Sequence, residues 1–376
     1  MSINDLKPET LAVHGHIPSE HPDISLPLHL TTTYRRTEDG NFGDFVYSRL
    51  DNPNRTHLEQ KIAALEGGVE AIAFSSGMAA INALFETVLH PGTHVIIPDD
   101  CYHGTRTLLE SFFSKWKVDF DSVDMTAVKN IEEAIKPDTK LIWIETPSNP
   151  QLKITDLKAV AKLAQNHNII TAADNTFATP LLQKPLDMGI DVVMHSSTKY
   201  FGGHSDILGG VIIMKQQNEL YHTIREYQKA AGAVPSPFDC WLLNRSLATF
   251  PLRFRQQCAN AIQIAEFLTT HPKIKKVYYP GLASHFNHDI AKEQMSNGFG
   301  AIVSVLLGET KYDALNFARK LKIIQHATSL GGVESLIEHR RSAEGNHPVS
   351  PDNLLRISIG VEHSDDLMKD IHQALE

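Results

Sequence analysis

The feature that most constrains this chain is an alternation of short apolar runs with segments of helical amphipathic spacing between residues 67 and 214. The apolar runs fall at residues 71–74, 94–97, 141–144, 169–173, 191–194 and 210–214. Segments such as 130–135 and 156–167, which lie between runs, have the spacing of amphipathic helices. This alternation is typical of a largely parallel sheet covered by helices on both faces. We therefore predict an α/β fold.

The pattern changes after about residue 240. A long helical stretch is predicted over residues 239–268, followed by strand-like runs at 274–279, 301–307 and 354–359 around a helix near 311–320. At 376 residues the chain exceeds the size at which a single core usually stops growing. We predict a histidine- and proline-rich arm over residues 1–45, a large domain over 46–240 and a smaller α+β domain over 241–376.

Composition excludes several classes of function. The net charge of −9, without a long Lys/Arg block, argues against nucleic-acid binding. No stretch approaches about 18 apolar residues and no apolar run follows a basic start, so we expect neither a membrane span nor a signal peptide. Three scattered cysteines fit a reducing cytoplasm. His14, His16, His21 and His29 are irregularly spaced without cysteine or carboxylate support, so we predict no metal site.

Polar residues follow several of the apolar runs, at the sheet edge where open α/β proteins bind ligands. Lys199 follows the run 191–194, and a lysine held in a pocket can lose its proton and become a nucleophile. Ser76 and Gly77 follow the run 71–74 and begin a helical segment, whose free N–H groups would favour a phosphate. Asp174 ends the run 169–173, and a buried carboxylate requires a cationic partner.

Two further loops would reach the same edge. Asn149 precedes Pro150 in a loop that the prolines stiffen, and Tyr102 offers an aromatic face. A phosphate cradle, an aromatic face, a buried carboxylate and an imine-forming lysine are together the groups that pyridoxal phosphate uses. We therefore predict pyridoxal 5′-phosphate as the cofactor, with its aldehyde on Lys199 and its ring nitrogen paired with Asp174.

Eight segments, in order along the chain, resemble the cystathionine β-lyase, γ-lyase and γ-synthase family of transsulfuration enzymes, which depend on pyridoxal phosphate. The resemblance implies fold type I, the aspartate-aminotransferase-like fold, with a mostly parallel seven-stranded sheet and a smaller C-terminal domain. The matching segments are Tyr47-Ser48-Arg49 with Asn52-Pro53-Asn54-Arg55, Leu65-Glu66-Gly67-Gly68, Ser75-Ser76-Gly77-Met78, Ser148-Asn149-Pro150, Asp174-Asn175-Thr176, Ser196-Ser197-Thr198-Lys199-Tyr200, Ser329 to Ser335, and Leu355-Arg356-Ile357-Ser358.

The resemblance also implies a role for each matching residue. Lys199 would form the aldimine with the cofactor and then carry protons, and Tyr102 would stack on the ring and shuttle protons. Arg356 would clamp the substrate carboxylate through two parallel hydrogen bonds. The implied cofactor-binding residues are Tyr47, Arg49, Ser76, Gly77, Met78, Tyr102, Asn149, Asp174, Thr176, Ser196, Thr198 and Lys199, and the implied substrate-binding residues are Asn149, Ser329, Glu334 and Arg356.

In the family, the residues that match Tyr47 and Arg49 reach the phosphate of the neighbouring subunit. The resemblance therefore implies a homo-oligomer with shared active sites, a dimer at minimum and usually a tetramer. The leading prediction is a carbon–sulfur lyase that cleaves cystathionine or a related thioether amino acid by β- or γ-elimination. The alternatives are γ-replacement on an activated homoserine, as in a cystathionine γ-synthase, and an aminotransferase.

Three departures from the family pattern bear on the reaction. Val46 stands where many γ-acting members have an acidic residue, which weakens a γ-type assignment. Glu334, by contrast, resembles the γ-type enzymes. Residues 337–348 form a shorter loop than the family usually has and lack its Met-Thr-His-Ala run. The far end of the substrate pocket is therefore the part that the resemblance predicts least.

Overall fold

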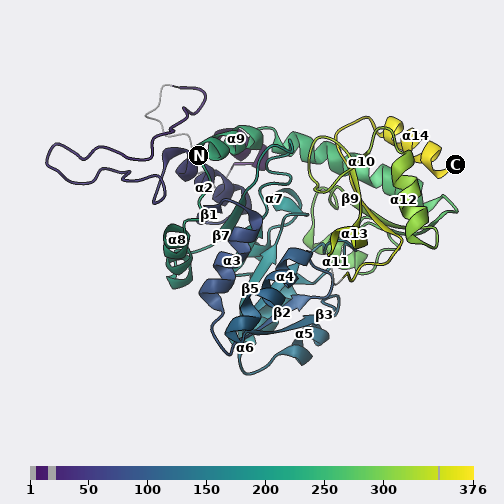
Figure 1. Ribbon diagram of the computed structural model, residues 1–376, viewed down its shortest axis with the longest axis horizontal. Coiled ribbons are helices and arrows are strands. Elements are labelled where there is room, and N and C mark those ends of the chain that lie inside the picture. Colours follow the sequence, from purple (N-terminus) through teal and green to yellow (C-terminus); the bar gives the residue numbers. More distant parts are fainter. Residues whose placement is uncertain (1–5, 16–22, 346–347) are drawn as a thin grey trace.

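The computed structural model describes residues 6–15, 23–345 and 348–376, which form two β-sheets with helices packed around them (Figure 1). A seven-stranded sheet is built from residues 70–214, and a five-stranded sheet from residues 274–358. Helices α9 (Pro237–Leu247) and α10 (Phe250–Thr269) lie between the two sheets in the chain. The domain boundary predicted at residues 240–241 falls inside α9, and the division into domains stays a prediction.

The larger sheet has the strand order β1-β7-β6-β5-β4-β2-β3. Only β7 runs antiparallel to its neighbours, so the carboxyl ends of the other strands lie at one edge. The strands are β1 (Glu70–Phe74), β2 (His94–Pro98), β3 (Asp119–Val123), β4 (Thr139–Glu145), β5 (Ile170–Asp174), β6 (Val192–His195) and β7 (Gly210–Met214).

Helices cover both faces of this sheet, because successive side chains of a strand point to opposite sides. In β4, Leu141 and Trp143 pack in the layer that contains α3 and α8, whereas Ile142 and Ile144 pack in the layer that contains α5 and α6. The helices of this part are α2 (Pro53–Glu66), α3 (Gly77–Val88), α4 (His103–Ser111), η2 (Phe113–Trp116), α5 (Val128–Ala134), α6 (Leu157–His167), α7 (Thr179–Leu182), η3 (Pro185–Met188) and α8 (Glu219–Ala231).

The smaller sheet has the order β10-β11-β12-β9-β8 and is antiparallel except between β10 and β11. Its apolar side chains pack with those of α10, α12 and α14. None of the described helices is both long and apolar enough to cross a membrane. The elements are β8 (Ile274–Tyr278), α11 (His288–Gln294), β9 (Ile302–Leu307), α12 (Lys311–Lys320), β10 (Gln325–His326), β11 (Leu336–His339), α13 (Arg340–Ala343), β12 (Leu354–Ser358) and α14 (Ser364–Leu375).

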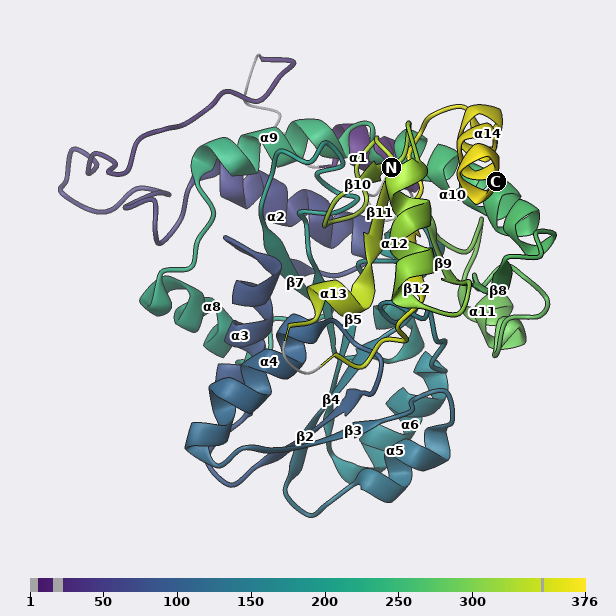
Figure 2. The ribbon, with the colours of Figure 1, turned by 45° about the vertical axis from the view of Figure 1, so that its right-hand side comes forward.

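Within residues 23–52 an extended arm projects from the body of the molecule, as Figures 1 and 2 show. Both ends of the segment are tied to the body, because the Leu26 carbonyl accepts a hydrogen bond from Trp241 and Asn52 is buried. The short helix α1 (Pro8–His14) precedes it and packs Leu11 into the core. Apolar side chains of the arm are exposed, among them Ile24 at 97% and Leu30 at 65%. The arm therefore presents apolar surface that the chain itself does not cover. His16 and His21, considered above as metal ligands, lie outside the described residues.

The predicted α/β fold, with a mostly parallel seven-stranded sheet and a smaller C-terminal part, is confirmed. Three details differ. The sequence pattern missed β3, because this edge strand reads Asp-Phe-Asp-Ser-Val and has no apolar run. The single helix predicted over 239–268 is two helices, because Pro251 favours the first turn of a helix and a second helix, α10, begins there. Part of the loop predicted over 337–348 belongs to β11 and α13.

Candidate active site

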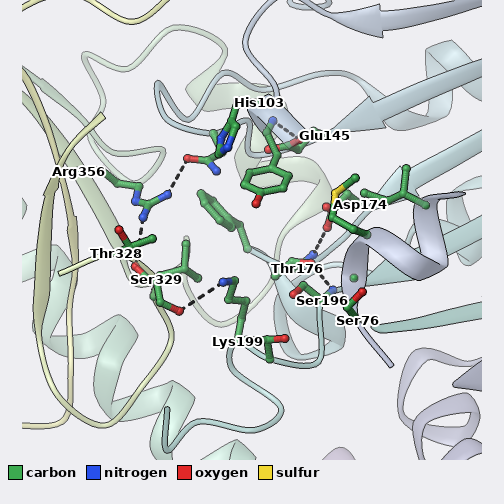
Figure 3. A pocket seen from close by; sticks show the side chains of 18 of the residues that line it. Ser76, His103, Glu145, Asp174, Thr176, Ser196, Lys199, Thr328, Ser329 and Arg356 are labelled. Carbon is green, nitrogen blue, oxygen red and sulfur yellow. Dashed lines mark hydrogen bonds between the residues drawn. The ribbon is translucent and has the colours of Figure 1, made fainter. Parts of the chain in front are cut away.

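A cavity of about 620 Å³ lies at the carboxyl edge of the larger sheet and is closed on the other side by residues of the smaller sheet. Figure 3 shows Arg356 and Asp174 on opposite sides of it, with Lys199 between them. Most of the predicted site residues line this cavity: Ser76, Gly77, Met78, Tyr102, Asn149, Asp174, Thr176, Ser196, Thr198, Lys199, Ser329 and Arg356. The strand-end residues therefore meet, as the sheet topology predicted.

Lys199 lies in the turn that follows β6, and its Nζ atom donates a hydrogen bond to the Ser329 hydroxyl at 3.3 Å (Figure 3). Burial lowers the pKa of Lys199 to about 8, and the positive charge of Arg356 contributes to the same shift. At neutral pH about a tenth of this amine is uncharged, because the ambient pH lies about one unit below its pKa. Lys199 is therefore able both to attack a carbonyl carbon and to exchange a proton.

Ser329 holds an unfavourable backbone conformation, with φ at 105°. Side-chain-bearing residues seldom adopt such an angle, and the strain persists only where the surroundings enforce it. Here the Ser329 hydroxyl faces Lys199, while its carbonyl oxygen accepts a hydrogen bond from Arg356 Nη2 at 3.1 Å. The strained residue thus joins the reactive amine to the guanidinium across the cavity.

The amino end of α3 forms a cradle of main-chain groups. Ser76 caps the helix by accepting a hydrogen bond from Ala79 N at 3.0 Å, and the other N–H groups of the first turn have no partner within the helix. A Cβ atom on Gly77 would lie 3.1 Å from Ser196, and one on Gly210 would lie 2.3 Å from the Ser76 carbonyl oxygen. Glycine at both positions therefore keeps the cradle open and close to the turn before Lys199.

Asp174 is the last residue of β5 and lines the cavity, and a main-chain N–H group holds its carboxylate in position. Its Oδ1 atom accepts a hydrogen bond from Thr176 N at 2.9 Å, and Thr176 Oγ1 in turn accepts one from Ser196 N at 2.9 Å. Burial raises the pKa of Asp174. Within residues 6–15, 23–345 and 348–376 no lysine, arginine or histidine forms an ion pair with it. The carboxylate therefore lacks the cationic partner that its burial requires.

Tyr102 lines the same cavity as Asp174. Its main-chain N–H donates to Glu145 Oε2 at 2.9 Å, and the missing side chain of Gly104 leaves room for its ring, since a Cβ there would lie 2.5 Å from Tyr102 Cε1. Burial, followed by the nearby charge of Asp174, raises the pKa of Glu145 well above its ordinary value. Negative charge on Asp174, which is paired with Glu145 across β5 and β4, therefore opposes ionisation of the Glu145 carboxyl.

These residues fit pyridoxal phosphate. The end of α3, with Thr198 and Ser196 beside it, offers donors to a phosphate. Asp174 lacks a cation that a protonated ring nitrogen would supply, the Tyr102 ring offers a face for stacking, and Lys199 offers an amine of lowered pKa for the aldehyde. The unfilled ion-pair requirement of Asp174 is the feature of the protein that this cofactor explains best.

A buried network holds the strand ends together behind the cavity. Glu66, the last residue of α2, shares a hydrogen bond of 2.7 Å with His195 Nε2 and accepts one from Asn175 Nδ2 at 3.1 Å. His195 ends β6 and Asn175 follows β5. The network therefore fixes the two strand ends that carry Asp174 and the turn to Lys199.

Arg356 lies on β12 and is held by three groups. Its Nη1 atom donates to Asn149 Oδ1 at 2.9 Å, and its Nη2 atom donates to the Ser329 carbonyl and to Glu338 Oε2 at 2.8 Å. Burial lowers the pKa of Arg356 to about 10, so the guanidinium is charged at neutral pH. A buried, charged and oriented guanidinium that lines the cavity suits the binding of a carboxylate.

Three predicted residues do not line the cavity of their own chain. Tyr47 and Arg49 lie on the arm, where Arg49 Nη1 donates to the Lys229 carbonyl. Glu334 accepts a hydrogen bond from Ser205 outside the cavity. The structure also adds residues to which the sequence pattern assigned no role: Glu145, His103, Thr328, Glu338 and Arg340. Of these, only Glu145 gave a local signal, as the polar residue that ends a buried strand.

Comparison with known proteins supports the cofactor and the reaction class. The model of a family described as Cys/Met metabolism PLP-dependent enzymes matches residues 9–376. A cystathionine γ-synthase of Mycobacterium tuberculosis is 44% identical, over 98% of this chain and 96% of its own length. A cystathionine β-lyase of Lactococcus lactis is 42% identical, over 98% of both chains. The solved structure of a cystathionine γ-lyase from Lactobacillus plantarum, complexed with L-serine, is 40% identical and superposes with a TM-score of 0.94 over 98% of both chains.

Proposed function

Because the chain belongs to the family of Cys/Met metabolism PLP-dependent enzymes, we propose that it cleaves the carbon–sulfur bond of cystathionine or a related thioether amino acid by β- or γ-elimination. The observation that carries the proposal is the position of Lys199 between Asp174 and Arg356, since its amine would then lie beside both the proposed cofactor-binding wall and the proposed carboxylate-binding wall. An α-amino acid that binds there presents its α-carbon to the Lys199 amine.

When bound, pyridoxal phosphate would supply an aldehyde that reacts with amines and a ring that accepts electrons. Asp174 would stabilise positive charge on the ring nitrogen, and the cradle at the amino end of α3 would hold the phosphate. Arg356 binds the substrate carboxylate, and Asn149 and Ser329 orient that guanidinium. Lys199 removes the α-proton and hands it on, which its lowered pKa permits near neutral pH.

The second candidate is the γ-replacement reaction of a cystathionine γ-synthase, which joins an activated homoserine to cysteine. It is favoured by the 44% identity to the mycobacterial enzyme of that name. Both reactions use the same groups for cofactor, carboxylate and proton transfer. They differ in how far along the substrate Lys199 moves a proton and in whether a thiol or a thioether occupies the far end of the cavity.

Identification of the products distinguishes the reactions. The purified holoenzyme is incubated with L-cystathionine, and the products are separated and identified by mass spectrometry. Pyruvate with homocysteine indicates β-elimination, and 2-oxobutanoate with cysteine indicates γ-elimination. Turnover of an O-acylated homoserine with cysteine, without breakdown of cystathionine, assigns the synthase reaction. An enzyme that only converts its cofactor to the pyridoxamine form, with release of an oxo acid, contradicts both proposals.

We also propose a cytoplasmic homo-oligomer, a dimer at minimum and a tetramer in full, in which Tyr47 and Arg49 reach the phosphate site of a neighbouring subunit. Two observations support it: these residues lie on a projecting arm away from their own cavity, and the arm exposes Ile24, Leu30 and Phe42. A second copy would cover these apolar side chains. Light scattering coupled to size exclusion gives the subunit number directly.

A further inference from the structure

Glu338 and Arg356 are cross-strand partners, because the antiparallel register of β11 and β12 places them opposite each other. Glu338 Oε2 accepts from Arg356 Nη2 at 2.8 Å, and the same oxygen also pairs with Arg340 Nη1 from the start of α13. The three side chains are 6%, 4% and 3% exposed, in the order Glu338, Arg356, Arg340. All three line the cavity. One carboxylate is therefore shared by two guanidinium groups in a nearly water-free wall.

The charges of these groups do not cancel. Burial opposes ionisation of Glu338, but Arg356 and Arg340 outweigh it and lower its pKa, so the carboxylate is charged. Glu338 alone would neutralise Arg356 and weaken its attraction for a second carboxylate. With Arg340 present the cluster keeps one net positive charge. The Nε atom of Arg340 has no hydrogen-bond partner among the described residues, so its burial is only partly compensated by the protein.

We propose that Arg340 is a positioning residue that acts through Glu338: it holds Glu338 against Arg356 and offsets its negative charge, so that the wall binds the carboxylate of an amino-acid substrate. The proposal rests on the role of Arg356 proposed above. It assigns the substrate-carboxylate site to a cluster of three residues, in which Glu338 fixes the orientation of Arg356 and Arg340 restores its charge. The charge balance, more than any one contact, sets the affinity.

The test measures equilibrium binding of two unreactive ligands to the holoenzyme by absorbance titration. L-norleucine has an α-carboxylate and no leaving group, and L-norleucinamide lacks the carboxylate charge. Arg340→Gln should weaken norleucine binding about tenfold or more and norleucinamide binding by less than about threefold. Glu338→Gln combined with Arg340→Gln restores a single net charge and should recover most of the norleucine affinity, which a merely structural loss would not.

Arg341→Gln is the matched control. Arg341 is the next residue of α13 and pairs with Asp352 outside the cavity, so this variant loses the same charge from the same helix and should leave both affinities unchanged. If the wild-type enzyme binds the two ligands equally well, the proposal that Arg356 binds the substrate carboxylate is contradicted. If it distinguishes them, and Arg340→Gln retains the wild-type ratio of affinities, or the double variant binds norleucine no better than Arg340→Gln, the present inference is overturned. Thermal unfolding and cofactor content of each variant show that it is folded and loaded.

Discussion

At the scale of single residues, the chemistry depends on the basicity of the Lys199 amine. Lys199→Ala should abolish covalent attachment of the cofactor, because no other described lysine lines the cavity. Activity should fall by about a thousandfold or more, since the imine tether and the proton carrier are lost together. Borohydride reduction followed by peptide mass spectrometry checks the attachment. A cofactor adduct that persists in Lys199→Ala would contradict the assignment.

The lowered pKa of Lys199 gives a second prediction, for the cofactor-free protein. Only the uncharged amine reacts with an acylating reagent, so the rate of Lys199 acylation should rise with pH and level off above its pKa of about 8. An exposed lysine should continue to rise towards about pH 10. Acetylation with a brief pulse of acetic anhydride at a series of pH values, quantified for each peptide, measures both. A midpoint for Lys199 equal to that of surface lysines would refute the shift.

The site residues that could be predicted are those that follow a recognisable pattern in the neighbouring sequence. Lys199, Asp174 and Ser76 each follow an apolar run, and strand ends of a parallel sheet share an edge, so their meeting follows from the sequence pattern. Glu338 and Arg340 carry no such signal. Their relation to Arg356 depends on the register of β11 against β12, and short segments of mixed polarity do not specify a register.

At the scale of elements, the turn into α3 depends on Gly210, the first residue of β7. A Cβ on Gly210 would lie 2.3 Å from the Ser76 carbonyl oxygen and 2.8 Å from Gly77 Cα, and these main-chain atoms cannot rotate away. Gly210→Ala should therefore displace the phosphate cradle and weaken cofactor affinity by about tenfold or more. Titration of the cofactor-free protein with pyridoxal phosphate measures this affinity.

Gly209→Ala is the neighbouring control. Its Cβ would first meet the Ser197 hydroxyl, at 2.5 Å, and this group can rotate about its χ1 angle. The control should weaken cofactor binding less than Gly210→Ala does. Equal losses in the two variants would show that general damage to the chain leading into β7, and not displacement of the cradle, accounts for the effect.

The elements that sequence patterns missed share a physical cause. β3 is an edge strand with partly exposed, charged residues, so it has no apolar run from which it could be predicted. β11 is four residues long and α13 is four residues long, too short for a period to be recognised. By contrast, every predicted strand of the larger sheet overlaps an observed one, because its apolar residues are buried on both faces.

At the scale of the whole molecule, shared active sites would make inactive variants complement each other. Lys199→Ala lacks the amine, and Arg49→Ala lacks the arm residue proposed to reach the neighbouring site. A mixed dimer has one site with both residues intact, so random reassociation of equal amounts should recover roughly a quarter of wild-type activity. The measurement is activity after joint unfolding and refolding, against each variant refolded alone. Mixtures no more active than their components would mean that each chain builds its own site.

The sequence by itself determined six of the seven strands of the larger sheet, the cofactor and the residues at the strand ends, because apolar runs, a helical period and the end of an apolar run are all local properties of the chain. Only the tertiary structure decided that Ser329 takes a strained conformation between Lys199 and Arg356, that the arm projects away from its own cavity, and that Glu338 joins Arg340 to Arg356. These features depend on contacts between residues far apart in the chain. The free energies of these contacts depend on which charged and polar groups are buried together, and a local sequence pattern does not contain that information.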